Sequence, residues 1–104
     1  MEFTLIKNSD NVLTARIDEK PKTINALIDF GTLFTGAIGE VIRICQPTKP
    51  HYFLITNINK ELAQQINFIF SIARTQLLND MENYQITIKS KDNFKTLEFK
   101  VEHI

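Results

Sequence analysis

The stretch TINALIDFGTLFTGAIGEVIRIC, residues 23–45, decides how the other elements of the chain can be arranged. Thr23 is a residue type that caps helices, and apolar residues follow it at helical spacing. These residues are Ile24, Leu27, Ile28 and Phe34. A helix is therefore predicted to begin near Thr23, and the question left open is where it ends.

Two interpretations fit the second half of this stretch. In the favoured one, the helix ends near Thr35 and Gly36 takes the left-handed position after its last turn. A strand then follows at about 40–46, because residues 41–45 are rich in the β-branched side chains that strands prefer. A loop at 47–50 would lead into the next strand.

The alternative is one long helix over residues 23–45, about 33 Å in length at about 1.5 Å per residue. Such a helix would contain Gly31, Gly36 and Gly39, and each glycine costs about 1 kcal/mol relative to alanine inside a helix. This summed cost favours the shorter helix, with Gly39 placed in a turn.

A hairpin is predicted at each end of the chain. The first joins residues 2–7 to 12–18 through the polar segment 8–11, whose short side chains hydrogen-bond their own backbone and favour turns. The second joins residues 84–90 to 94–103 through a short polar turn. Alternation of apolar and polar residues in the second pair predicts one buried face and one exposed face.

Between the hairpins lie a strand at 52–56 and a long helix at 60–81. The strand has apolar residues on both sides, which predicts an internal strand covered on each face. Asn57 or Asn59 can cap the helix. Its apolar stripe comprises Leu62, Ala63, Ile66, Ile69, Phe70, Ala73, Leu77 and Met81. Phe68 and Ile72 lie off this stripe, so they are candidates for contact with a partner.

These elements predict a single α+β domain over residues 1–104, an antiparallel sheet of hairpins with two helices packed on it. The predicted order is ββα(ββ)αββ, with the strand near 40–46 uncertain. The alternative order, with one long helix at 23–45, is ββαβαββ. No motif in the sequence identifies a family.

Composition narrows the classes of partner. Basic and acidic residues number 12 each, so the formal net charge is zero. Binding to nucleic acid usually requires surplus Lys and Arg, so a nucleic-acid partner is disfavoured. A neutral chain repels copies of itself weakly, which favours self-association.

The expected location is the cytoplasm. Cys45 is the one cysteine, so no disulfide can form within the chain, which fits a reducing compartment. The first residues lack the pattern of a signal peptide. The uncharged stretch 30–39 is about half the length that crosses a bilayer, so no membrane association is expected.

Residues suited to catalysis are few and scattered. The two histidines, His51 and His103, lie in a loop and beside the C-terminal residue, and no Cys/His spacing suits zinc. Cys45 and Ser71 both lie among apolar residues, with no motif that activates a nucleophile. We therefore expect no catalytic residue, no metal ligand and no cofactor.

Two places are candidates for binding. The glycine-rich corner supplies Gly36 and Gly39, and the following loop and strand supply Lys49, His51 and Tyr52. Together they suggest a site for a small molecule or a nucleotide messenger. Prolines, a cation and an aromatic side chain near a rigid loop are also common in recognition surfaces.

The favoured hypothesis is a small non-enzymatic protein-interaction module, a regulator, inhibitor or adaptor, that acts as a homodimer. Its predicted interface residues are Phe68 and Ile72, which an isologous contact would bury. The alternative is the small-molecule or nucleotide-messenger binding domain.

Overall fold

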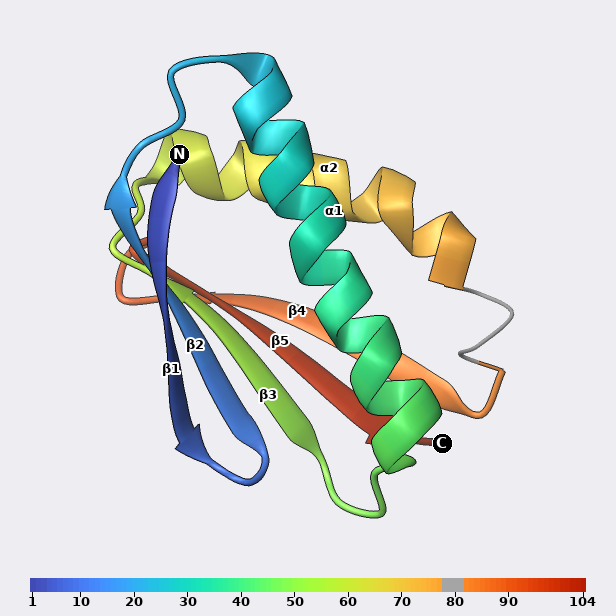
Figure 1. Ribbon diagram of the computed structural model, residues 1–104. Helices are drawn as coiled ribbons and strands as arrows, with labels where there is room; N and C mark the ends of the chain where they lie inside the picture. Colours follow the sequence, from blue (N-terminus) through green and yellow to red (C-terminus); the bar gives the residue numbers. More distant parts are fainter. Residues whose placement is uncertain (78–81) are drawn as a thin grey trace.

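The computed structural model of the chain describes the backbone of residues 1–77 and 82–104 and the side chains of residues 1–73 and 82–104. The five strands of its sheet and the two helices are shown in Figure 1. The strands are β1 (Glu2–Ser9), β2 (Val12–Glu19), β3 (His51–Thr56), β4 (Tyr84–Lys91) and β5 (Thr96–His103). The helices are α1 (Ile24–Glu40), its π-helical continuation η1 (Val41–Cys45), and α2 (Lys60–Leu77). The predicted α+β class, with hairpins and two packed helices, is confirmed.

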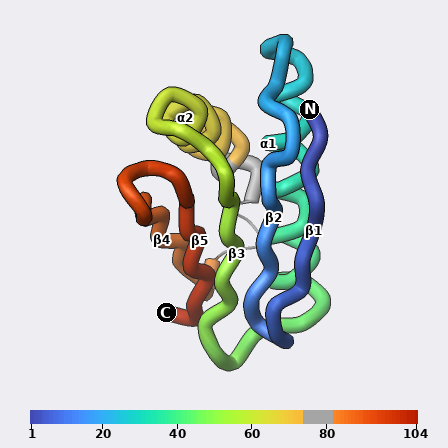
Figure 2. The backbone as a smooth tube through the Cα atoms, turned by 90° about the vertical axis from the view of Figure 1, so that its left-hand side faces the viewer, coloured from blue at the N-terminus to red at the C-terminus, as the bar shows by residue number. Residues whose placement is uncertain are grey.

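The sheet is mixed, so the prediction of a purely antiparallel sheet is wrong for one pair of strands. The strand order is β1-β2-β3-β5-β4, and β2 and β3 run parallel while the other neighbours are antiparallel. A parallel pair needs a crossover connection, which α1 and η1 provide between β2 and β3. Figure 2 shows the strands side by side, with α1 behind β1 and β2.

Both helices pack on the same face of this sheet, and aromatic rings fill the space between the layers. The ring of Phe34 on α1 lies 5.9 Å from that of Phe53 and 5.1 Å from that of Phe99. Phe70 on α2 lies 4.8 Å from the same Phe99 ring. Phe99, on β5, is therefore the point where α1, α2 and the sheet meet.

The opposite face of the sheet carries no helix in the described part of the chain. On β3, Phe53 and Ile55 are buried against the helices, whereas Tyr52 and Leu54 are half-buried on the open face. The central position of β3 confirms an internal strand. The expectation that this strand is covered on both faces is wrong, because its second face is screened only by its neighbours in the sheet.

The helix starts follow the capping residues of the sequence. The Thr23 hydroxyl accepts a hydrogen bond of 3.1 Å from the Ala26 backbone N–H, and Asn59 Oδ1 accepts one of 2.8 Å from that of Leu62. Asn57 instead has a positive φ of 63° and donates through Nδ2 to the Ile17 carbonyl at 2.7 Å. That bond ties the end of β3 to the end of β2.

The prediction of a strand near 40–46 is wrong, because residues 41–45 continue the first helix as the π-helical turn η1. Burial explains the difference. Ile38 and Ile42 are spaced by four residues and both lie in the core, so a helix through position 42 extends the apolar face of α1. Gln46, with φ 43° and ψ 65°, then ends the helix in the left-handed conformation. The segment thus follows the long-helix alternative.

The predicted stripe of α2 is confirmed over the described side chains. Leu62, Ala63, Ile66 and Phe70 are buried, while Ile69 and Ala73 are half-buried. The predicted contributions of Leu77 and Met81, and the predicted extension of the helix over 78–81, lie outside the described residues.

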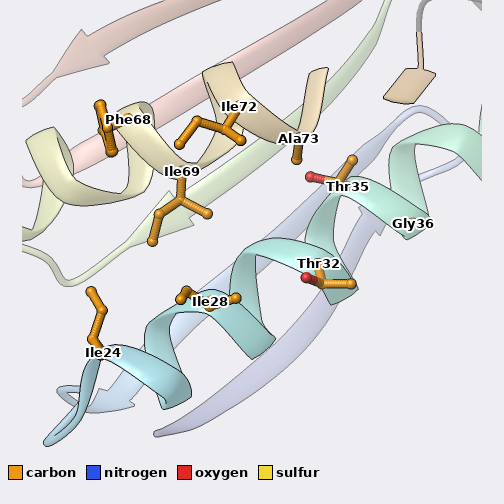
Figure 3. Close-up of a pocket in the computed structure, with 9 residues that line it drawn as sticks. All are labelled: Ile24, Ile28, Thr32, Thr35, Gly36, Phe68, Ile69, Ile72 and Ala73. Atoms are coloured by element: carbon orange, nitrogen blue, oxygen red, sulfur yellow. The ribbon is translucent and has the colours of Figure 1, made fainter. Parts of the chain in front are cut away.

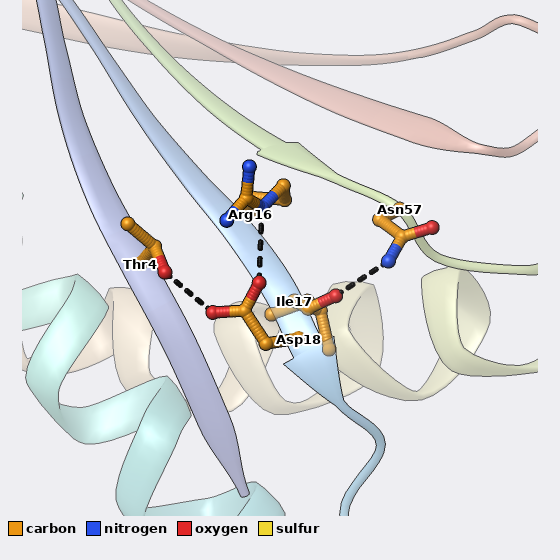
Figure 4. Close-up of polar contacts among 5 residues, drawn as sticks. All are labelled: Thr4, Arg16, Ile17, Asp18 and Asn57. Atoms are coloured by element: carbon orange, nitrogen blue, oxygen red, sulfur yellow. Dashed lines mark hydrogen bonds and ion pairs between the residues drawn. The ribbon is translucent and has the colours of Figure 1, made fainter.

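A polar cluster holds the open ends of the first hairpin. Figure 4 shows the Asp18 carboxylate accepting hydrogen bonds from the Thr4 hydroxyl and from Arg16 Nε, the latter at 2.9 Å. The hydrogen bond from Thr4 is the main reason that the pKa of Asp18 is lowered from its ordinary value, and the bond from Arg16 lowers it further.

Replacing Thr4 with valine is expected to raise the pKa of Asp18 toward its ordinary value, because the ionised carboxylate loses its main donor. The lowered pKa of the folded state stabilises the fold above the unfolded pKa, and this contribution is lost as the pH falls through the folded value. An NMR titration of the Asp18 carboxyl measures the change. A pKa of Asp18 that is the same in both proteins would show that the Thr4 bond is absent in solution. The control is Thr87→Val on β4, which should leave the pKa of Asp18 unchanged.

Candidate functional site

The described part of the chain has a hollow between the two helices, which we call the α1–α2 groove. Its volume is about 640 Å³, and Figure 3 shows the residues that line it. From α1 they are Ile24, Ile28, Thr32, Thr35 and Gly36, and from α2 they are Phe68, Ile69, Ile72 and Ala73. None of these side chains is ionisable, so the groove is apolar and uncharged.

Helical periodicity places these residues together. On α1, positions 24, 28, 32 and 36 follow a spacing of four and so share one face of the helix. On α2, the pairs 68/69 and 72/73 repeat with the same spacing. The helices come into close contact at Gly31, where an added Cβ would overlap Cγ2 of Ile69. Because Gly31 has no side chain, Ile69 can rest against α1 and line the groove.

The rim of the groove consists of large apolar side chains exposed to solvent. The exposed fractions are 66% for Phe68, 64% for Ile24, 58% for Ile72 and 45% for Ile28. Single exposed apolar residues are ordinary, but contiguous groups of them usually mark a binding surface. We refer to these four residues as the apolar rim.

Two threonines supply the side-chain polar atoms of the groove. Thr35 is only 6% exposed, and its hydroxyl oxygen has no hydrogen-bond partner among the described residues. Figure 3 shows this side chain on α1, on the side that faces Ala73 of α2. A buried hydroxyl without a partner costs about 1–3 kcal/mol. The Thr35 hydroxyl is therefore available to form a hydrogen bond with a molecule bound in the groove.

The binding residues predicted from the sequence do not line one site. Gly36 lines the α1–α2 groove, and Gly39 lies inside α1 rather than in a turn. His51 and Tyr52 line a separate hollow of about 230 Å³ at the start of β3. Lys49 is exposed in the loop before it, where its carbonyl oxygen lies 3.3 Å from His51 Nδ1. The glycine corner and the His51 loop therefore contribute to different surfaces.

The two predicted interface residues, Phe68 and Ile72, do lie together on the apolar rim. The prediction from the sequence did not include Ile24 and Ile28 in the interface, and grouped them with Leu27 and Phe34 only as apolar residues at helical spacing. The signal was present in their spacing. Ile24 and Ile28 lie four residues apart and begin a second stripe, which continues through Thr32 to Gly36.

Other candidate chemistries find no support in the described residues. No group of three or more His, Cys, Asp or Glu side chains there could hold a metal ion. Cys45 is a free thiol, exposed at the end of η1 rather than buried in a strand. Over the described part of the chain, neither helix has the length and hydropathy that a membrane span requires.

No protein-family model matches the sequence, and a search of curated proteins finds no significant match to it.

Proposed function

We propose that this chain is a small non-enzymatic protein-interaction module, a regulator, inhibitor or adaptor, that binds its partner through the α1–α2 groove. The observation that carries the proposal is the apolar rim, in which four large side chains from two helices are exposed around one hollow. Covering them would remove apolar surface from water, which is the main driving force of protein association.

The chemistry of the groove suits binding rather than proton transfer. The described residues of its lining include no acid, base or thiol, so the contacts that its rim offers to a partner protein are apolar packing. Such a surface resembles the buried centre of protein interfaces, where charged residues are depleted and aromatic residues are enriched. Phe68, the one aromatic residue on the rim, is the natural anchor.

The partner that fits this surface best is a second copy of the chain. The surface can pair with a copy of itself, because the apolar rim carries both a projecting ring, Phe68, and isoleucine side chains against which such a ring can pack. A two-fold contact would pack each ring against the isoleucine side chains of the other copy's apolar rim. The net charge of zero adds little repulsion between copies.

Replacing Phe68 with serine is expected to weaken self-association at least about tenfold, because truncating a central aromatic anchor costs about 2 kcal/mol or more. Sedimentation velocity over a wide range of protein concentration measures the effect. The unfolding free energy of the monomer should change by no more than about 0.5 kcal/mol, since the ring is exposed.

The matched control is Leu33→Ser, on the same pair of helices. Leu33 is 55% exposed but faces away from the α1–α2 groove, beside Leu5 and Leu13. It should leave self-association unchanged. A wild-type chain that stays monomeric at the highest concentration would overturn the homodimer, and equal effects of the two substitutions would overturn the choice of surface.

We also propose the cytoplasm as the compartment. The exposed free thiol of Cys45 supports this location, because reducing conditions keep such a thiol from forming disulfides with other proteins.

A further inference from the structure

The Thr35 hydroxyl is a polar group placed where the apolar contact proposed above does not use it. It lies below the apolar rim, nine-tenths buried, with no hydrogen-bond partner among the described residues. A threonine inside a helix can turn its hydroxyl back to the carbonyl four residues earlier. Thr35 makes no such bond, and Figure 3 shows its side chain on the groove side of α1.

The groove also has the size and character of a small-molecule site. Ligand sites usually measure about 300–1,000 Å³ and combine an apolar lining with a few polar groups that fix orientation. The α1–α2 groove measures about 640 Å³, and its described lining is uncharged, with the hydroxyls of Thr32 and Thr35 as its side-chain polar groups. Gly36 leaves open space beside them.

We propose that the α1–α2 groove binds a neutral, largely apolar small molecule whose polar group hydrogen-bonds the Thr35 hydroxyl. Among the described residues the lining offers no cation to balance a phosphate or carboxylate, so an anionic ligand would lose its hydration without compensation from them. This site goes beyond the proposed protein contact. The ligand lies beside Ile69 and Thr35, whereas the contact between copies uses the apolar rim.

The probe that tests the proposal is N-phenyl-1-naphthylamine, a neutral aromatic amine with one N–H donor whose fluorescence rises in apolar surroundings. The wild-type chain should bind it saturably. Thr35→Val keeps the shape of the side chain and removes the hydroxyl, so we expect it to weaken binding about five- to tenfold. Gly36→Leu places a side chain in the hollow and should abolish binding. Thr87→Val, an exposed threonine on β4, should bind as the wild type does.

Thermal unfolding of the free protein provides a second readout. Thr35→Val should raise the midpoint, because it removes a buried hydroxyl that has no partner, while the affinity for the probe falls. A substitution that merely damages the fold would lower both quantities.

Three results would overturn the proposal. They are the absence of saturable probe binding, equal affinity in the wild type and Thr35→Val, and tighter binding of the anionic analogue 1-anilinonaphthalene-8-sulfonate than of the neutral probe. Sedimentation of the same samples separates the two proposals. Self-association without probe binding would remove the ligand site alone, and probe binding by a monomer would remove the homodimer alone.

Discussion

Replacing Phe99 with alanine is expected to lower the free energy of unfolding by about 3–5 kcal/mol, because a large side chain at the centre of the core is lost. The ring is fully buried and lies against Phe34 of α1 and Phe70 of α2, with centroid distances of 5.1 and 4.8 Å. Its removal leaves a cavity where both helices meet the sheet. Chemical denaturation followed by circular dichroism measures the loss.

Phe68→Ala is the matched control, because it makes the same chemical change on an exposed ring. At a protein concentration too low for self-association, it should change the unfolding free energy by no more than about 0.5 kcal/mol. A loss below about 1 kcal/mol in Phe99→Ala would contradict the packing of both helices over one ring.

The hairpins and the helix starts could be predicted from the sequence because their causes are local. Alternation and polar turns predict β1 with β2 and β4 with β5, and the structure confirms both antiparallel pairs. Thr23 and Asn59 act on backbone N–H groups only three residues away. The parallel pairing of β2 with β3 has no such local cause, since it depends on how the crossover through α1 packs on the sheet.

Residues 41–45 show where local preference fails. Their β-branched side chains favour a strand, and three glycines disfavour a longer helix. Burial of Ile38 and Ile42 against the sheet decides in favour of the helix. A strand at 41–45 would also lack a place beside β3, because β3 already pairs with β2 on one side and β5 on the other.

The candidate site could be predicted in part. Phe68 and Ile72 lie off the buried stripe of α2, and that pattern alone marks them as exposed. The sequence does not reveal that α1 presents Ile24 and Ile28 opposite them, because this depends on how the helices cross. The helices approach each other at Gly31, and only the structure shows that the side chain of Ile69 packs on this glycine.

Replacing Gly31 with valine is expected to lower the free energy of unfolding by about 3 kcal/mol, at the upper end of the usual cost of overpacking. A Cβ at this position would overlap Cγ2 of Ile69, so α1 and α2 must move apart or Ile69 must leave its position. The same movement would change the shape of the α1–α2 groove, so the affinity for N-phenyl-1-naphthylamine should fall as well. Denaturant unfolding and probe titration measure the two effects.

Gly36→Val is the matched control on the same helix, and it separates packing from helix propensity. Among the described residues, an added Cβ at Gly36 meets no atom within 4 Å apart from its own helix backbone, so helix propensity is the main effect expected there, and valine is a slightly better helix former than glycine. Its unfolding free energy should stay within about 0.5 kcal/mol of the wild type. Adding Ile69→Ala to Gly31→Val removes the overlapping methyl group, and the two changes should couple by at least about 1 kcal/mol. If they add independently, Gly31 does not set the approach of the helices. If they couple, the position of Ile69 in the α1–α2 groove depends on Gly31, a glycine inside the helical segment 23–45.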